Sequence, residues 1–486
     1  MALLGGYVRV SSKGDRDPDR WLTVPQQREA IERWCRDHGH RLVDVRQDIY
    51  VSGASADRPN LEQLVEQIEA GNLAGIAVAK LDRFSRWLPH GVNTLRQTEV
   101  RMRSDGRILT THTGSLPRTP DLGAMIDARE RGAEVDSTAF RRVAEAAVDR
   151  VVVKQLEAGI DVGSDGEQPR ASYCTYAADR MRGFGGESHR APLSDFVDYP
   201  EFAAHYAKRF MSDDAMARQP AAIGDVVYED LAGVDEELDI FKSVLERQQK
   251  QFADAFMTAS SPGVMVLMMR NQHYPTEGDY IAALAPEIAK EYQRIVERDL
   301  ILQVDCPDLP AERITNYVDV PFNEYLGIVE RNIGELNRSL EGIPPERVRM
   351  HCCWGNYAGP HTRDPALRDL MSRLYEANVG TLVLPFGNPR HEHEIDVFRE
   401  FPLPDDMAVV VGVIDVTTNW VEHPKLIAKR LVTAAEAIGD PTRVIAGTDC
   451  GFGTFWDYAL VADEVVWLKL KALREGADLA SEQLWR

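Results

Sequence analysis

The most constraining feature of this 486-residue chain is a series of short apolar runs that recur after residue 102. Each has the length of a β-strand, and amphipathic helical segments such as Tyr280–Leu300 and Asn323–Leu340 lie between them. The runs are Ile108–Thr113, Ile160–Gly166, Val264–Met269, Leu300–Asp305, Val348–Cys353, Thr381–Phe386, Ala408–Asp415 and Arg443–Asp449. Buried strands that alternate with helices form parallel sheets covered on both faces, and eight such units predict an α/β fold, a (β/α)8 TIM barrel.

One connection in this series is too long for a single helical crossover. Residues 168–261 separate two of the predicted strands, which indicates an insertion over the mouth of the barrel. Its Gly183–Ala222 part contains scattered prolines and aromatic residues, and it is predicted to be a lid or cap.

Residues 1–100 show a shorter alternation of strands and helices. The predicted strands are Tyr7–Val10, Arg41–Gln47 and Gly75–Ala79, and the predicted helices are Val24–Gly39 and Leu61–Ala70. This order predicts a small parallel α/β domain, and it is incomplete because the pattern stops near Val100. We therefore expect two domains, 1–100 and 102–486, and Met102 is a plausible independent start.

Composition and charge narrow the class of protein. With 44% apolar and 27% charged residues the chain is globular, no apolar run could cross a bilayer, and the N-terminus lacks the pattern of a signal peptide. Six cysteines are too sparse for a disulfide scaffold, and a cytoplasmic location is expected. Residues 1–100 are electrically balanced, so the net charge of −21 lies in the remainder, which would repel nucleic acid.

Polar residues follow the predicted barrel strands, where barrel enzymes place their chemistry. In a strand, residues i and i+2 share a face, so His351 and Cys353 point the same way and Cys352 points away. Cys450, at the end of the eighth strand, can meet them across the mouth. Alone, the His-x-Cys pair is also compatible with an inert buried cysteine. One imidazole and two thiolates together predict a zinc site with an open fourth position.

Residues 102–486 resemble the catalytic barrel of cobalamin-independent methionine synthase and its single-barrel relatives, which include epoxyalkane:coenzyme M transferase. The motifs that carry the resemblance are Thr110–Arg118, Gly166-Glu167, Gln303–Asp305, His351-x-Cys353-Trp354-Gly355-Asn356, Asn388–Glu394 and Gly447–Gly451. The resemblance implies transfer of a methyl or alkyl group to a small thiol such as homocysteine, with Zn²⁺ as cofactor.

The resemblance also implies roles for individual residues. His351, Cys353 and Cys450 would ligate the zinc ion. The acceptor thiol would be held by residues at other strand ends, namely Gly114, Ser115, Glu167 and Asp305.

Three departures from the synthase pattern matter. Pro385 stands at the position of a glutamate zinc ligand, which implies three protein ligands or a substitute such as Glu392. Thr417 stands where the synthase has a histidine proton donor, and the synthase's N-terminal barrel is absent. A donor other than methyltetrahydrofolate is therefore expected, for example a methylated corrinoid, on a corrinoid protein, or an epoxide.

Residues 1–100 resemble the catalytic domain of serine recombinases, the resolvase/invertase family, in truncated form. A serine among several guanidiniums suits phosphoryl transfer to a hydroxyl. The matching positions are Ser11, Arg9, Arg58, Asp82, Arg83 and Arg86. The resemblance makes Ser11 the nucleophile that attacks DNA, so DNA is a partner only if this domain is active.

Three interpretations remain open on the sequence. The favoured one is a zinc-dependent thiol alkyltransferase barrel, acting on homocysteine or a similar thiol, behind a vestigial recombinase fragment. The second is a DNA-processing protein that acts through Ser11 and carries the barrel as a passenger. The third is that residues 1–101 do not belong to the native product. No membrane partner is expected.

Overall fold

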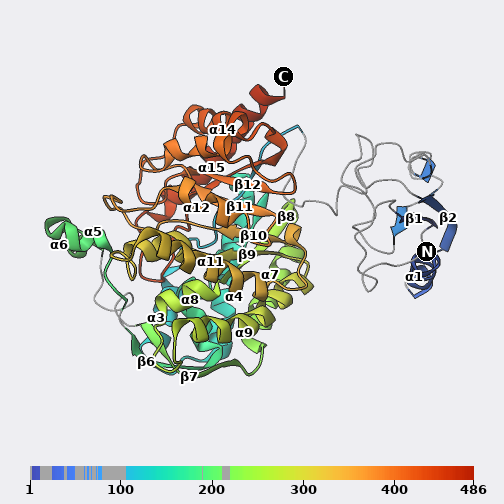
Figure 1. The fold of residues 1–486 in the computed structure, drawn as a ribbon. Coiled ribbons are helices and arrows are strands. Elements are labelled where there is room, and N and C mark those ends of the chain that lie inside the picture. Colours follow the sequence, from blue (N-terminus) through green and yellow to red (C-terminus); the bar gives the residue numbers. More distant parts are fainter. Residues whose placement is uncertain are drawn as a thin grey trace. The chain divides into compact units, whose positions relative to one another are not determined.

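The computed structural model describes residues 3–10, 24–37, 41–49, 75–78, 106–188, 190–210 and 219–485, with a few single positions between 60 and 73. The chain divides into two compact units, Met1–Glu99 and Val100–Arg486 (Figure 1). None of the described helices is long and apolar enough to span a membrane.

The first unit contains a parallel three-stranded sheet in the order β2-β1-β3, as predicted. Its elements are β1 (Leu3–Val10), α1 (Val24–Asp37), β2 (Arg41–Ile49) and β3 (Gly75–Val78). Ile31 and Cys35 form the apolar face of α1, and both are buried together with Tyr7 of β1. The helix predicted over 61–70 lies mostly outside the described residues.

The second unit is the predicted (β/α)8 barrel. Eight parallel strands follow one another in the order β4-β13-β12-β11-β10-β9-β8-β5, and a parallel bridge between Thr111 and Val162 joins the two ends. The strands are β4 (Leu109–Thr110), β5 (Val162–Gly163), β8 (Asp254–Ser260), β9 (Ile301–Asp305), β10 (Val348–His351), β11 (Thr381–Pro385), β12 (Ala408–Ile414) and β13 (Val444–Thr448).

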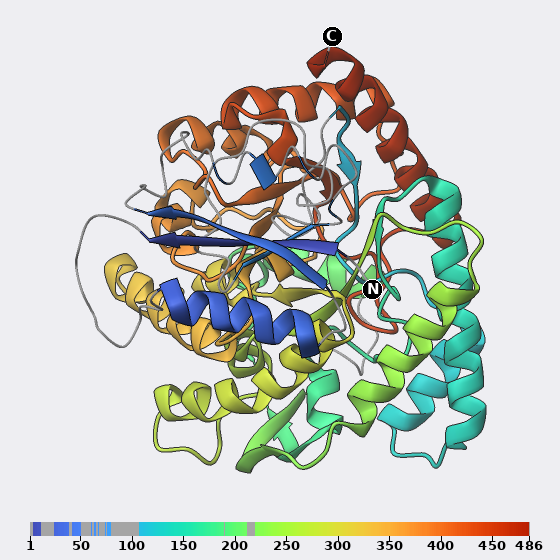
Figure 2. The same cartoon turned by 90° about the vertical axis from the view of Figure 1, so that its right-hand side faces the viewer.

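Helices cover the outside of this sheet, as the two views show (Figures 1 and 2). The longer ones are α3 (Pro120–Glu130), α4 (Ser137–Ala158), α7 (Ala232–Arg247), α9 (Glu277–Glu297), α11 (Phe322–Ser339), α12 (Leu367–Leu374), α14 (Pro424–Ile438) and α15 (Asp463–Leu484). The large apolar core between helices and strands takes all its buried members from residues 108–480.

One predicted strand is wrong. Residues Val264–Met269 were expected to form the third strand, but Pro262–Met268 is helix α8, and the strand is the preceding segment β8. Ser261 caps the helix by accepting a hydrogen bond from the amide of Val264, and Pro262 suits the first helical turn. All seven residues of α8 are buried, so the run lacks the periodicity that separates a helix from a strand.

The insertion is shorter than predicted, because α7 and β8 belong to the barrel itself. What remains is an antiparallel hairpin, β6 (Met181–Ser188) and β7 (Gln219–Tyr228), with two short helices between its strands. These helices are α5 (Ser194–Asp198) and α6 (Pro200–Phe210). We call residues 181–228 the insertion hairpin.

Aromatic packing and one buried carboxylate hold the insertion hairpin against the barrel loops. Phe196 and Tyr206 pack with Tyr357, which follows β10. Asp195 accepts hydrogen bonds from the Tyr357 hydroxyl at 2.7 Å and from the backbone amide of His361 at 2.6 Å. The hairpin therefore contacts the loops at the carboxyl ends of the strands.

A shortened chain that starts at Met102 is expected to fold, because the described buried members of its core all lie within residues 108–480. Residues 1–100 alone should be marginally stable, since a small sheet with few layers buries little surface. Thermal unfolding followed by circular dichroism would check both fragments. An insoluble 102–486 fragment, or a cooperatively unfolding 1–100 fragment that cleaves recombination-site DNA, would contradict this expectation.

Candidate active site

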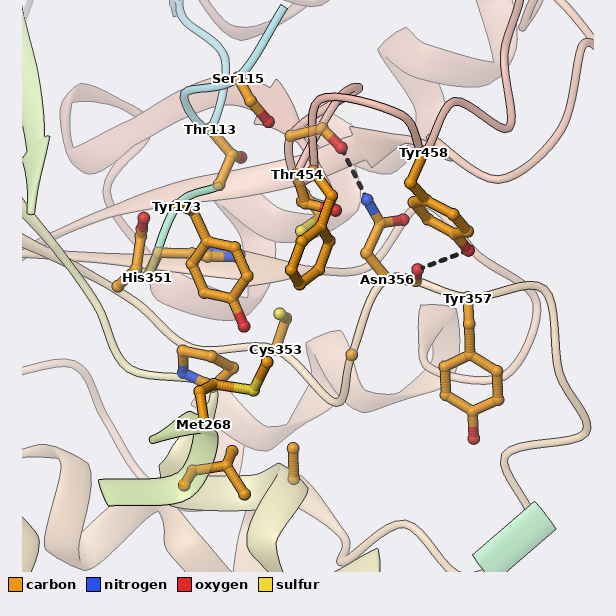
Figure 3. A pocket seen from close by; sticks show the side chains of 18 of the residues that line it. Thr113, Ser115, Tyr173, Met268, His351, Cys353, Asn356, Tyr357, Thr454 and Tyr458 are labelled. Atoms are coloured by element: carbon orange, nitrogen blue, oxygen red, sulfur yellow. Dashed lines mark hydrogen bonds between the residues drawn. The ribbon is translucent and has the colours of Figure 1, made fainter. Parts of the chain in front are cut away.

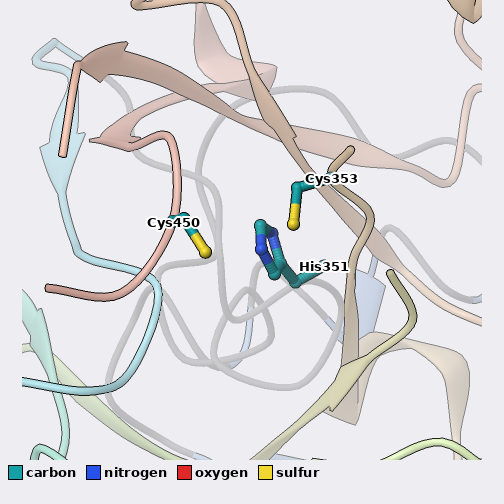
Figure 4. A group of neighbouring side chains, drawn as sticks. All are labelled: His351, Cys353 and Cys450. Carbon is teal, nitrogen blue, oxygen red and sulfur yellow. The ribbon is translucent and has the colours of Figure 1, made fainter. Parts of the chain in front are cut away.

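Three of the predicted side chains meet at the carboxyl ends of the barrel strands. His351 is the last residue of β10, Cys353 lies two residues beyond it, and Cys450 lies two residues beyond the end of β13. Their ligand atoms all lie within 4.8 Å of one another (Figure 4). Cys352 is fully buried in the apolar core instead. We call His351, Cys353 and Cys450 the thiolate cluster.

The His351 ring is oriented as a metal ligand would be. Its Nδ1 lies 3.3 Å from the carbonyl oxygen of Val383 and can donate a hydrogen bond to it. Its Nε2 is buried and has no hydrogen-bond partner. A backbone carbonyl on one ring nitrogen fixes the tautomer that leaves the other nitrogen as a lone-pair donor.

The two cysteines share a proton, which makes one of them a thiolate. A hydrogen bond from the Cys450 thiol, aided by the His351 ring, lowers the pKa of Cys353 well below its usual value, although burial opposes this. The same interaction, together with burial, raises the pKa of Cys450. With the Cys450 proton displaced, two thiolates and an unpartnered imidazole nitrogen form a donor set that fits a thiophilic divalent metal ion.

The described residues contain no fourth His, Cys, Asp or Glu whose ligand atom joins the thiolate cluster. Pro385 ends β11 and offers no ligand. Glu392, the predicted substitute, is paired with Arg430 at 3.0 Å and is 45% exposed. The geometry therefore leaves three protein ligands in this cluster.

The thiolate cluster opens into a pocket, which we call the main pocket (Figure 3). Three of the predicted acceptor-binding residues line it, namely Ser115, Glu167 and Asp305. Asn356, the last residue of the motif that begins at His351, also lines it. Four other lining residues come from loops and the insertion hairpin and were missed by the sequence analysis: Tyr173, Arg190, Tyr357 and Tyr458. The Asn356 amide donates to the carbonyl of Gly451 at 2.9 Å, and the Tyr458 hydroxyl donates to the carbonyl of Asn356 at 3.0 Å.

Gly114 lies directly against Glu167. Its φ of +131° is a conformation that other residues rarely adopt, and a Cβ here would collide with Oε1 of Glu167 and lie 2.9 Å from Cγ2 of Thr258. Glu167 itself has a φ of +55°, which is uncommon for a residue with a side chain. Backbone strain of this kind persists where the surroundings hold a side chain in a required position.

Neither carboxylate of the main pocket forms an ion pair with a lysine or arginine of the described residues. Burial, and then the neighbouring Asp305, raises the pKa of Glu167 to about 8. Burial raises the pKa of Asp305 to about 6. Oε2 of Glu167 is buried without a hydrogen-bond partner. An ammonium group placed here would stabilise both carboxylates in their charged form.

Arg190, in the insertion hairpin, brings the opposite charge to the main pocket. Its guanidinium lies 3.1 Å from the sulfur of Met268, and no carboxylate among the described residues forms an ion pair with it. The pocket thus combines two carboxylates, a free guanidinium and the thiolate cluster.

A second hollow, which we call the side pocket, lies beyond the thiolate cluster. It also borders Cys353 and Cys450, and its other walls include His361, His391 and Thr417. The Thr417 hydroxyl donates to Asp415 at 2.7 Å. At this position the synthase has a histidine proton donor, whereas Thr417 has no imidazole and its hydroxyl is already bound to Asp415.

The predicted recombinase residues lie outside the described part of the structure. Arg9 is placed only as a backbone position in β1, and Ser11, Arg58, Asp82, Arg83 and Arg86 are not described. The proposed nucleophile therefore stays a prediction.

Together, the fold and this site define a (β/α)8 barrel with a His–Cys–Cys cluster at the carboxyl ends of its strands. The chain resembles cobalamin-independent methionine synthase over this barrel. It is 26% identical over 378 residues to "Methionine synthase" of Sulfolobus acidocaldarius, covering 77% of this chain and 93% of that protein. The protein of the same name from Sulfurisphaera tokodaii is also 26% identical, over 376 residues and with the same coverage.

Solved structures show the same fold. The B12-independent methionine synthase from Shewanella sp. W3-18-1, in complex with selenomethionine, matches with a TM-score of 0.56 at 20% identity, over 78% of this chain and 99% of that one. A putative vitamin-B12-independent methionine synthase from Listeria monocytogenes matches with a TM-score of 0.51 at 17% identity, over 76% and 98%.

The family described as "Resolvase, N terminal domain" matches residues 4–146, which supports the fusion with a resolvase-like segment. This match runs past the first compact unit. Residues from Leu109 onward already form β4, α3 and the start of α4 of the barrel.

Proposed function

We propose that this protein is a zinc-dependent enzyme that transfers a methyl group to a small thiol, homocysteine or a close analogue. The observation that carries the proposal is the thiolate cluster at the end of a pocket that also holds two carboxylates and an unpaired guanidinium. The similarity to methionine synthases supports the same reaction class.

His351, Cys353 and Cys450 would hold the metal ion. Bound zinc would lower the pKa of an acceptor thiol so that the thiolate is present near neutral pH. The residues around it would bind the rest of the acceptor: Glu167 and Asp305 would accept hydrogen bonds from its ammonium group, and Ser115 and Arg190 line the same pocket.

The donor would approach from the side pocket, because that hollow also borders the two sulfur atoms. A folate donor requires a proton for its leaving amine, and the Thr417 hydroxyl is already engaged with Asp415. A methylated corrinoid needs no such proton and is the favoured donor. The alternative function is the opening of an epoxide by a thiol of the coenzyme M type.

The test uses the full-length protein loaded with zinc. Methionine should form from homocysteine and methylcobalamin, with little or none from methyltetrahydrofolate, as measured by mass spectrometry. Calorimetry in buffers of different ionisation enthalpy should show release of about one proton when homocysteine binds. Robust turnover with methyltetrahydrofolate would refute the donor argument, and a lack of proton release with every thiol would refute the zinc–thiolate chemistry.

We expect the Arg190 guanidinium to bind the carboxylate of homocysteine. Arg190→Gln should therefore raise the KM for homocysteine by about 10- to 100-fold, which corresponds to the loss of one hydrogen bond between charged groups. Turnover of 3-aminopropane-1-thiol, which lacks the carboxylate, should stay unchanged. Steady-state kinetics with both thiols would measure the difference. Arg182→Gln is the matched control, because Arg182 lies in the same hairpin, is 63% exposed and pairs with Glu229. An equal loss of activity with both thiols would show that Arg190 does not bind the carboxylate.

A further inference from the structure

A second group of potential metal ligands lies at the wall of the side pocket. It consists of His361, Asp364 and His391, whose ligand atoms lie within 4.8 Å of one another. The side chain of His391 is only 6% exposed, and that of Asp364 is 1% exposed.

All four ring nitrogens of the two histidines face oxygen atoms. His391 Nδ1 lies 2.8 Å from Oε2 of Glu394, and His391 Nε2 lies 2.9 Å from Oδ2 of Asp364. His361 Nε2 lies 3.1 Å from the carbonyl oxygen of Tyr357, and His361 Nδ1 lies 2.9 Å from the same Asp364 oxygen.

A neutral imidazole has only one N–H, so each ring can satisfy only one of its two oxygen neighbours. The outer contacts, to Glu394 and to the Tyr357 carbonyl, are the hydrogen bonds that usually orient metal-binding histidines. With those two protons in place, both remaining lone pairs point at the carboxylate of Asp364. A metal ion held between these two lone pairs and the carboxylate would satisfy all three groups at once.

The surroundings hold this arrangement rigidly. Glu394 also accepts a hydrogen bond from the amide of Leu367 at 2.7 Å, which fixes it at the start of α12. The ring of His391 stacks on Trp354 with centroids 4.0 Å apart. His361 has a φ of +53°, which is uncommon for residues other than glycine. Oδ1 of Asp364 is buried with no hydrogen-bond partner, so the carboxylate keeps spare acceptor capacity.

We propose that His361, Asp364 and His391 form a second metal site, separate from the thiolate cluster, for a divalent transition-metal ion such as zinc. Two ligand atoms bound at about 2.1 Å in tetrahedral geometry lie roughly 3.4 Å apart, so the nitrogen–oxygen separations of 2.9 Å would widen by about 0.5 Å when an ion binds. Two imidazoles and one carboxylate suit zinc and its first-row neighbours, whereas the thiolate cluster selects softer ions.

The experiment measures metal stoichiometry in the full-length protein after removal of metal and titration with zinc, followed by dialysis and elemental analysis. The wild-type protein should retain two zinc ions per chain. Asp364→Asn should retain one, and Cys450→Ser should retain one. His393→Gln is the matched control, because His393 lies in the same segment but is exposed, and it should keep both ions.

Titration with cobalt(II) tells the two sites apart. The sulfur-to-cobalt charge-transfer band should persist in Asp364→Asn and disappear in Cys450→Ser. If circular dichroism shows that Asp364→Asn is unfolded, His361→Gln replaces it, since that side chain is 14% exposed. One zinc ion in the wild type, or two in the folded Asp364 or His361 variant, would overturn the second site. Neither result would contradict metal binding at the thiolate cluster or the proposed methyl transfer.

Discussion

Serine at Cys450 or at Cys353 is expected to abolish zinc binding at the mouth of the barrel and, with it, thiol methylation. Both sulfur atoms belong to the thiolate cluster, and a serine oxygen is a poor substitute for a soft thiolate ligand. Changes in residues that only orient ligands already cost ~10–100-fold in metal affinity or activity, and the loss of a ligand should cost more. Charge-transfer absorption of the cobalt(II)-loaded protein would measure the loss.

Cys352→Ser is the matched control. Cys352 is adjacent in sequence but fully buried in the apolar core, so its sulfur does not reach the metal. This variant should keep the cobalt(II) band and the activity, and it should lose only some stability, because a buried thiol is replaced by a more polar hydroxyl. An equal loss of metal in Cys352→Ser would contradict the alternation of side chains along β10.

Gly114→Ala is expected to impair acceptor binding severely without touching any metal ligand. The new methyl group would collide with Glu167, and the backbone would be held at a φ that costs a residue with a side chain roughly 1–3 kcal/mol. Displacement of Glu167 should raise the KM for homocysteine, while the zinc content stays as in the wild type. Steady-state kinetics together with metal analysis would separate the two effects.

Gly123→Ala provides the comparison. Gly123 lies within α3, and a Cβ at this position meets no heavy atom within 4 Å. Alanine favours a helix over glycine by about 1 kcal/mol, so this variant should be as stable as the wild type or more stable, with unchanged kinetics. Normal homocysteine kinetics in Gly114→Ala would show that the position of Glu167 does not control acceptor binding.

Much of the barrel and of its site was predictable from the sequence, because both depend on short-range patterns. The alternation of side chains along a strand placed His351 and Cys353 on one face. The closure of eight strands brought Cys450 toward them. The resemblance to a known family then indicated that Glu167 and Asp305 share their pocket.

The features that the sequence analysis predicted wrongly or did not predict have physical causes. The Val264–Met269 run is buried on all sides, and a helix without a polar face carries no periodic signal. Arg190 lies in the insertion hairpin, whose path over the barrel depends on aromatic contacts with Tyr357 that no local pattern encodes. The sequence analysis did not single out His361 and Asp364, because their meeting with His391 depends on tertiary packing.

The insertion hairpin leaves the barrel after β5 and returns before β8 without adding a strand to the main sheet. Arg190 belongs to this segment, whereas His351, Cys353 and Cys450 lie at or just beyond the ends of β10 and β13. The guanidinium that would bind the acceptor's carboxylate can therefore change during evolution independently of the proposed metal ligands. Exchange of the insertion hairpin between related proteins should therefore change the preference for an acceptor with or without a carboxylate, while the metal-binding residues stay the same.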